Sequence, residues 1–89
     1  MYYSYILYSK KYDEFYAGYT ADMKKRYKQH KDGEVKSTKN RDVTLIHYEA
    51  YISEKDARRR EKYFKTTKGK RTLQLMLKDT LKIVTGPVV

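Results

Sequence analysis

Residues 2–8, with the sequence YYSYILY, constrain the fold of this chain more than any other segment. The run is rich in aromatic and β-branched side chains, which favour a β-strand. Alternate side chains of a strand point to opposite faces, so Tyr5 and Leu7 fall on one face and Ile6 falls on the other. Because both faces are apolar, we predict a central strand that is covered on both sides.

Two further strands are predicted, at residues 15–19 and at residues 43–51. The polar stretch 9–14 connects the first two strands, and neighbouring strands with so short a connection should pair antiparallel. Residues 33–42 are polar and basic, so we interpret them as a loop that precedes the third strand.

The segment before that loop has helical periodicity. Met23, Tyr27 and His30 recur at intervals of four and three residues, which places them on one stripe of a helix over residues 22–31. Gly33 follows directly and suits a helix end.

Two helices are predicted in the remainder of the chain. Ser53 resembles the first residue of a capping box, so a helix should run over about residues 54–67. We expect Gly69 to interrupt it. The last helix is marked by leucines that recur every four residues, namely Leu73, Leu77 and Leu81.

The predicted order of elements is therefore ββαβαα, an α+β domain with a small, mainly antiparallel three-stranded sheet flanked by helices. A length of 89 residues leaves room for one domain. We assign residues 1–80 to this domain and residues 81–89 to a C-terminal tail.

Composition limits the function classes. Lys and Arg total 21 against 11 Asp and Glu, yet 15% of the residues are aromatic, which excludes a disordered basic tail. A chain without cysteine has no disulfide scaffold and no thiolate zinc site. No apolar run reaches the roughly 18–20 residues of a membrane span. We expect a cytoplasmic domain whose first candidate partner is a polyanion, most simply nucleic acid.

Basic side chains gather in three places, where we predict contacts with the phosphate backbone of DNA. The predicted contacts are Lys24, Lys25 and Lys28 in the first helix, Lys36, Lys39 and Arg41 in the loop, and Lys65, Lys68 and Lys70 near the end of the second helix. An ordinary solvated lysine face is the alternative. Backbone contacts carry no sequence information, so we expect a preference for structure or strand type over a defined sequence.

Two charged residues lie close to the predicted apolar stripes. At 100° per residue, Glu61 is about 40° from Ala57, while Lys65 points to the far side of that helix, and Arg26 is about 60° from Met23. One interpretation is that Arg26 and Glu61 pair, or that each reaches water at the edge of its stripe. The other is a site where Glu61 holds a metal ion and Arg26 holds a phosphate.

Eleven tyrosines are the second unusual feature. Tyr5 and Tyr16 lie on adjacent predicted strands, and in the obvious register of the hairpin their phenols can reach the same face. The alternative is that tyrosines serve here as amphipathic residues of the core and its rim.

Together these residues resemble the motifs of the GIY-YIG nuclease family in its short single-domain form, which is similar to the nuclease domain at the start of a bacterial excinuclease. Ser4-Tyr5-Ile6 stands where the family has G-I-Y, and Tyr16-Ala17-Gly18 stands for Y-I-G. Arg26 has the spacing of the family's arginine, and Glu61 matches its metal-binding glutamate. The resemblance covers roughly residues 2–75. Larger members often add an Asn or His after the glutamate helix, and this chain has neither after Glu61. His30 and Asn40 are polar groups available instead, although neither is at the matching position.

The resemblance implies a Mg²⁺-dependent endonuclease that hydrolyses DNA phosphodiester bonds. Glu61 would hold the cation, Mg²⁺ or another divalent ion such as Mn²⁺. Arg26 would neutralise charge on the phosphate, while Tyr5 and Tyr16 would orient the attacking water and one of them would help to deprotonate it. Two alternatives stay open: a non-catalytic nucleic-acid-binding module that keeps the fold and the charge, and a basic protein that docks an acidic protein partner.

Overall fold

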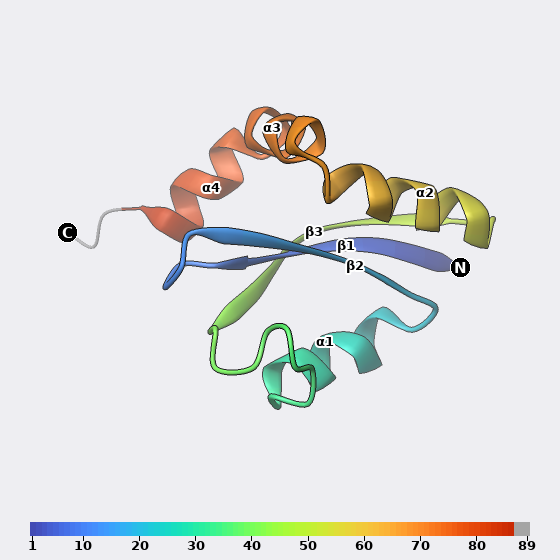
Figure 1. The fold of residues 1–89 in the computed structure, drawn as a ribbon, viewed down its shortest axis with the longest axis horizontal. Coiled ribbons are helices and arrows are strands. Elements are labelled where there is room, and N and C mark those ends of the chain that lie inside the picture. Colours follow the sequence, from blue (N-terminus) through green and yellow to red (C-terminus); the bar gives the residue numbers. More distant parts are fainter. Residues whose placement is uncertain (87–89) are drawn as a thin grey trace.

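The structure is a computed structural model that describes residues 1–86. A three-stranded sheet lies between two layers of helix, with α1 on one face and α2, α3 and α4 on the other (Figure 1). This arrangement confirms the predicted α+β class. The elements are β1 (Tyr2–Ser9), β2 (Glu14–Thr20), α1 (Met23–Lys31), β3 (Val43–Tyr51), α2 (Glu54–Phe64), α3 (Thr67–Met76) and α4 (Lys78–Thr85).

The sheet has the order β2-β1-β3 and both pairings are antiparallel, so β1 is central, as its two apolar faces predict. Tyr5 lies opposite Gly18 and Leu7 lies opposite Tyr16, which puts Tyr5 and Tyr16 on the same face. In β3 the pairing slips by one residue near Ile46, which forms a bulge. β2 is left as an edge strand.

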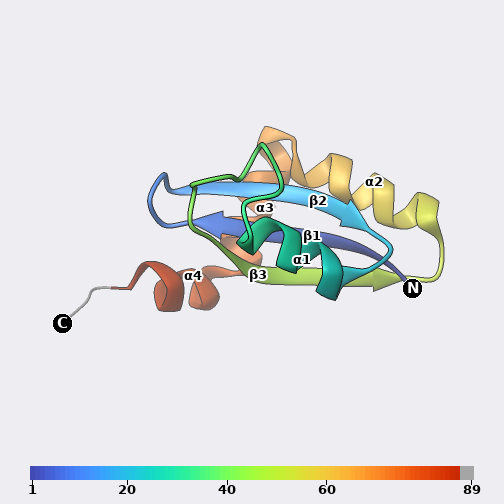
Figure 2. The same ribbon diagram turned by 90° about the horizontal axis from the view of Figure 1, so that it is seen from below.

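The two faces of the sheet are covered differently. On one face, Ile6 packs in a cluster with Phe64 of α2, Leu73 of α3 and Leu77, which lies between α3 and α4. The opposite face is covered by the single helix α1 and by the loop that follows it (Figure 2). There Tyr5, Leu7 and Val43 are buried, with Met23 and Tyr27 packed against them.

The predicted helix over residues 54–67 is too long, and Gly69 does not interrupt it. α2 ends at Phe64, and α3 begins after Thr66, whose hydroxyl accepts a hydrogen bond from the Gly69 amide at 2.9 Å. Gly69 is buried inside α3, where a Cβ atom would overlap the backbone of Tyr63. The glycine therefore allows α3 to approach the end of α2 closely, and the hydroxyl cap of Thr66 defines the new helix.

The last predicted helix is divided in two. The break comes at Leu77, which ends α3 and precedes α4. Residues 81–85, which we assigned to a tail, lie in α4, and residues 87–89 are outside the described part of the chain. The division between domain and tail stays a prediction. Within residues 1–86, no helix is long and apolar enough to span a membrane.

Candidate active site

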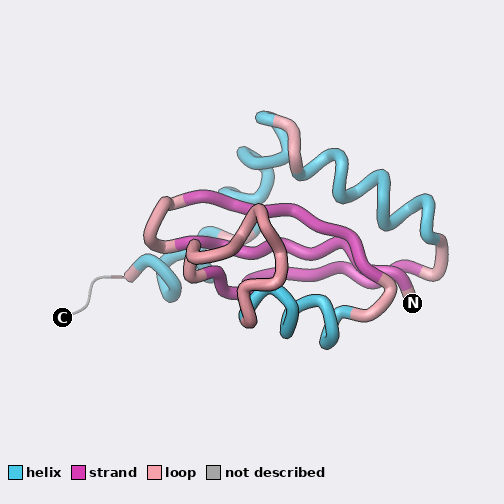
Figure 3. Tube along the Cα trace, turned by 60° about the horizontal axis from the view of Figure 1, so that its bottom comes forward, coloured by secondary structure: helices cyan, strands magenta, loops and turns pink. Residues whose placement is uncertain are grey.

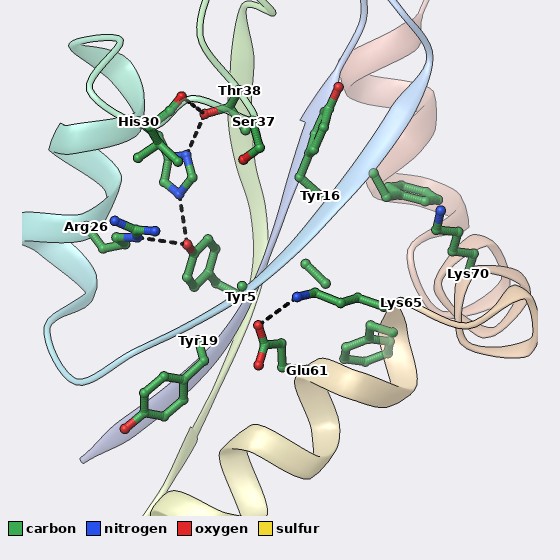
Figure 4. Close-up of a pocket in the computed structure, with 15 residues that line it drawn as sticks. Tyr5, Tyr16, Tyr19, Arg26, His30, Ser37, Thr38, Glu61, Lys65 and Lys70 are labelled. Carbon is green, nitrogen blue, oxygen red and sulfur yellow. Dashed lines mark hydrogen bonds and ion pairs between the residues drawn. The ribbon is translucent and has the colours of Figure 1, made fainter.

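A cleft lies along the edge strand β2 and takes its walls from both faces of the sheet. Its lining includes all four residues that the sequence predicts to be catalytic, namely Tyr5, Tyr16, Arg26 and Glu61. They come from four elements, since β1, β2, α1 and α2 each contribute one. Figure 4 shows the cleft, with Tyr5 between the α1 side and the α2 side.

The phenol of Tyr5 is the centre of the α1 side of the cleft. The residue is almost fully buried, and its hydroxyl oxygen accepts a hydrogen bond from Arg26 Nε at 3.3 Å. The same hydroxyl lies 2.8 Å from Nε2 of His30, and Nδ1 of His30 lies 2.7 Å from Oγ1 of Thr38 (Figure 4). Tyr5 is therefore held from two sides by side chains of α1.

Gly18 leaves the space through which the Tyr5 ring reaches the cleft. The two residues are paired in the sheet, and a Cβ atom at position 18 would overlap the Tyr5 ring. Only a residue without a side chain lets the ring cross β2 at this point. The glycine of the Tyr16-Ala17-Gly18 motif thus has a steric reason that the sequence alone does not supply.

Tyr16 lies in the cleft lining but does not contact Tyr5. Its phenol donates a hydrogen bond to Oε2 of Glu14 at 3.0 Å, and in Figure 4 it points away from Tyr5. Burial and the bond to Glu14 raise the pKa of the Tyr16 phenol. Burial also raises the pKa of the Tyr5 phenol, although the Arg26 guanidinium opposes this change. Both phenols therefore carry their protons at neutral pH.

Glu61 faces the cleft from α2, and Lys65 is its partner. Lys65 Nζ lies 3.0 Å from Oε2 of Glu61, and only 17% of the Glu61 side chain is exposed. The prediction that Lys65 points to the far side of its helix is wrong, because its long side chain reaches back one turn to the carboxylate. Arg26 forms its hydrogen bonds with Tyr5 and Gln29 instead, so the interpretation in which Arg26 pairs with Glu61 is wrong as well.

His30 is a site residue that sequence reasoning placed on the stripe of the first helix and named only as an available polar group. It is 6% exposed, and burial together with the nearby Arg26 charge lowers its pKa to about 4, so the imidazole is neutral. The signal available was its position four residues after Arg26 on the same helix face. Thr38, in the loop that follows α1, had no such signal.

The cleft offers one carboxylate to a metal ion. Residues 1–86 contain no group of three His, Asp or Glu side chains that could hold an ion on their own. Mg²⁺ is commonly held by one or two carboxylates, with waters and substrate phosphates completing its shell. Glu61 alone therefore fits a hydrated Mg²⁺ that is shared with a substrate.

Only some of the residues that we predicted to contact phosphate line the cleft. Lys65 and Lys70 line it, and Lys25 lies beside Arg26 in an adjoining depression. Lys28 pairs with Asp32 at 2.6 Å, and the Arg41 guanidinium stacks on the ring of Tyr12 at 4.5 Å. The others are spread over the exposed surface of α1, the loop and α3, namely Lys24, Lys36, Lys39 and Lys68.

Comparisons with known proteins identify the family of this chain. The GIY-YIG catalytic domain family matches residues 1–74. UPF0213 protein YazA of Bacillus subtilis (strain 168) is 42% identical over 66 residues, which cover 71% of this chain and 67% of that protein. UPF0213 protein CPE1444 of Clostridium perfringens (strain 13 / Type A) is 34% identical over 84 residues, covering 92% and 89%.

A solved structure resembles the whole fold. The solution NMR structure of UPF0213 protein BH0048 from Bacillus halodurans has a TM-score of 0.51 and 32% identity, and the match covers 98% of this chain and 89% of that one. The family match spans most of the chain and includes all four cleft residues that the motifs identified. The chain therefore belongs to the GIY-YIG family of nucleases.

Proposed function

We propose that this protein is a Mg²⁺-dependent endonuclease that hydrolyses DNA phosphodiester bonds with a preference for DNA structure over sequence. Its family points to an endonuclease acting on nucleic acid, generally DNA. The observation that carries the proposal is the cleft in which Tyr5, Arg26 and Glu61 converge from three elements. A protein that only bound DNA would have no need of a nearly buried carboxylate beside its cationic groups.

Arg26, Lys65 and Lys70 give the cleft its affinity for a phosphate group. All three line it, and the chain as a whole has a net charge of +10. Arg26 is the best placed to act during the reaction, because its guanidinium is fixed by bonds to Tyr5 and Gln29. A fixed cation costs no reorganisation when negative charge develops on the phosphate.

Glu61 would hold the divalent cation, Mg²⁺ or another such as Mn²⁺. When bound, that ion supplies positive charge to the scissile phosphate and to the leaving oxygen. Lys65 keeps the Glu61 carboxylate turned toward the cleft and balances its charge before the cation binds. With one carboxylate at the site, binding of the cation should depend strongly on substrate phosphate.

Tyr5 would take a proton from the attacking water. Its own hydroxyl proton would pass to Nε2 of His30 at 2.8 Å, so that the phenol is regenerated as the water is deprotonated. Burial and the charge of Arg26 lower the pKa of His30. A phosphate bound at Arg26 would offset that charge and make His30 a stronger base. Tyr16 would contribute by orienting the water from the other wall.

A non-catalytic nucleic-acid-binding module is the second candidate. It is favoured by one observation, the raised pKa of both phenols, since a phenol acts as a base most readily when its pKa is low. The two candidates differ in what Glu61 does. A pure binder would lose little when the Glu61 carboxylate becomes an amide.

Glu61→Gln is therefore the deciding variant. Wild-type protein should cut branched and linear DNA in Mg²⁺ but not in EDTA, leaving 5′-phosphate ends. Glu61→Gln should lose cleavage, keep its fold and bind DNA as tightly or more tightly, because one negative charge is removed. Glu34→Gln makes the same chemical change at an exposed loop position and serves as the control. Normal cleavage by Glu61→Gln, or none by the wild type on any DNA, would contradict the proposal.

A further inference from the structure

Four side chains form one continuous series of hydrogen bonds on the α1 side of the cleft. Arg26 Nε lies 3.3 Å from the Tyr5 hydroxyl, which lies 2.8 Å from His30 Nε2. His30 Nδ1 lies 2.7 Å from Thr38 Oγ1, and that hydroxyl lies 3.5 Å from the carbonyl oxygen of Val35. Figure 4 shows the series running from α1 through Tyr5 and back to the loop.

The two ends of this series favour one direction of hydrogen-bond donation. A guanidinium can only donate, so Arg26 donates to the Tyr5 oxygen, and a carbonyl can only accept, so Thr38 donates its hydroxyl proton to Val35. If every bond is satisfied, Tyr5 donates to Nε2 of His30, and Nδ1–H of His30 donates to Thr38. This order requires a neutral imidazole with its proton on Nδ1. The lowered pKa of His30, about 4, is consistent with a neutral ring.

Thr38 is held in place by the backbone hydrogen bonds of the loop and by burial. It is 2% exposed although it belongs to a polar, basic segment. Its amide donates to the carbonyl of Val35 at 3.2 Å, and its own carbonyl accepts from the amide of Arg41 at 3.1 Å. The loop folds back beside α1 (Figure 3). This brings the Thr38 hydroxyl to His30, which precedes it by eight residues in the sequence.

We propose that Thr38 is a positioning residue that holds His30 in the Nδ1–H tautomer and so leaves Nε2 free to receive the Tyr5 proton. The inference rests on the proposed nuclease function for its catalytic consequence, but the tautomer itself does not. In the other tautomer, Nε2–H would donate to the Tyr5 oxygen. Tyr5 would then have two donors and no acceptor on this side for its own proton.

The test compares the wild type with Thr38→Val, which keeps the volume and removes the hydroxyl, and with Thr38→Ser, which restores it. The ¹⁵N resonances of the His30 ring, measured at neutral pH without DNA, distinguish the protonated from the unprotonated nitrogen. Thr44→Val makes the same substitution at an exposed position of β3 and is the control. Single-turnover cleavage is measured on all four proteins.

We expect Nδ1–H in the wild type and in Thr38→Ser, and a mixture of tautomers in Thr38→Val. Cleavage by Thr38→Val should fall roughly 10–10²-fold, less than the roughly 10²–10⁴ for losing a proton-transfer group outright, with recovery in Thr38→Ser. Nε2–H in the wild type would overturn the proposal even if Thr38→Val failed to fold. An unchanged tautomer and rate in a folded Thr38→Val would overturn it too. The expected tautomers without any cleavage would contradict the nuclease function and leave the positioning of His30 supported.

Discussion

The two faces of the sheet bury different kinds of side chain. The face covered by α2, α3 and α4 buries apolar groups, with Ile6, Phe64, Leu73 and Leu77 in one cluster. The α1 face also buries Leu7 and Val43, but it adds a set of buried polar side chains, each of which has at least one hydrogen-bond partner. Those groups are Tyr5, Ser9, His30 and Thr38.

This difference indicates that the two faces contribute differently to stability and to function. Burial of apolar surface stabilises a fold without requiring a particular geometry at each atom, whereas a chain of hydrogen bonds fixes donors and acceptors in place. The α2–α4 face should therefore carry most of the stability, and the α1 face most of the chemistry. β2 lies at the edge between them, which is where the cleft can take Glu61 from one face and Tyr5 from the other.

The largest effect is expected at the hydroxyl of Tyr5. Tyr5→Phe keeps the ring and should lower the single-turnover rate at saturating DNA by roughly 10²–10⁴. Its stability should fall by only about 1–2 kcal/mol, because the buried His30 Nε2 loses its partner. Tyr16→Phe should lose less rate, since that phenol is bound to Glu14.

Tyr48→Phe is the matched control for both tyrosine variants, because it removes a hydroxyl from a ring that is 55% exposed. If Tyr5→Phe cleaved DNA at the same rate as Tyr48→Phe, the assignment of a catalytic role to the Tyr5 hydroxyl on the α1 face would be wrong. An equal loss in Tyr5→Phe and Tyr16→Phe would mean that the second phenol turns toward the substrate when DNA binds.

Phe64→Ala should give the largest loss of stability. Phe64 is 1% exposed and packs in the cluster with Ile6 and Leu73. Removing a buried phenylalanine side chain costs about 3–5 kcal/mol of unfolding free energy, a large fraction of what a small domain has. Urea denaturation measures this loss, with the exposed Ile52→Ala as control. A cost below about 1 kcal/mol would contradict the assignment of stability to this face.

Much of the fold follows from local patterns, and these were predicted correctly. The strand at residues 2–8 is central because its two faces are apolar, and the helix over residues 22–31 follows from its stripe of Met23, Tyr27 and His30. The break between α2 and α3 was missed for a tertiary reason. Gly69 looks like a helix breaker in the sequence, but its missing side chain accommodates the backbone of Tyr63.

The candidate site was predictable as far as the family motifs reach. The spacing of Tyr5, Arg26 and Glu61 identified residues that the fold does bring to one cleft. The contact between His30 and Thr38 could not be predicted in the same way, because the loop conformation that joins them follows no periodicity. Helical angles alone also misplaced Lys65, since they describe where a side chain begins and not how far it reaches.

The two faces should also respond to acid in different pH ranges. Burial and Arg26 lower the pKa of His30 from 6.5 to about 4, so its contribution to stability is present above pH 6.5 and is lost as the pH falls toward 4. On the other face, burial would raise the pKa of Glu49, but hydrogen bonds from Arg60, Tyr51 and His47 outweigh it and lower the pKa from 4.5 to about 2. The Glu49 contribution is therefore present above pH 4.5 and lost toward pH 2.

Each contribution is at most roughly 3 kcal/mol. Unfolding free energy measured from pH 8 to pH 2 should decline in two stages. His30→Gln should flatten the decline above pH 4.5, and Glu49→Gln the decline below it. If either variant flattened both stages, the two faces would be titrating as one unit, and the division between them would not hold for electrostatics.

The smallest effect separates two buried serines on β1. Ser4 and Ser9 are both fully buried, but they point to opposite faces of the sheet. Ser9 Oγ donates to the carbonyl of Arg41 and accepts from the amide of Tyr12. Ser4 Oγ, on the α2 face, has no hydrogen-bond partner among residues 1–86. Among residues 1–86, Ser4 is thus the fully buried polar side chain on the α2 face, where Glu49 and Arg60 form a half-buried ion pair.

The same substitution should therefore have opposite signs at these two positions. Ser9→Ala removes a paired hydroxyl and leaves the Tyr12 amide and the Arg41 carbonyl without it, so stability should fall by about 1–2 kcal/mol. The Ser4 hydroxyl loses its hydrogen bonds to water when the protein folds and gains none in the folded state. Ser4→Ala should therefore leave the stability equal or raise it by about 1 kcal/mol. Urea denaturation of the two variants beside the wild type measures both. A loss in Ser4→Ala as large as that in Ser9→Ala would show that the α2 face depends on a fully buried hydroxyl in the same way as the α1 face, which would break the contrast between the two faces.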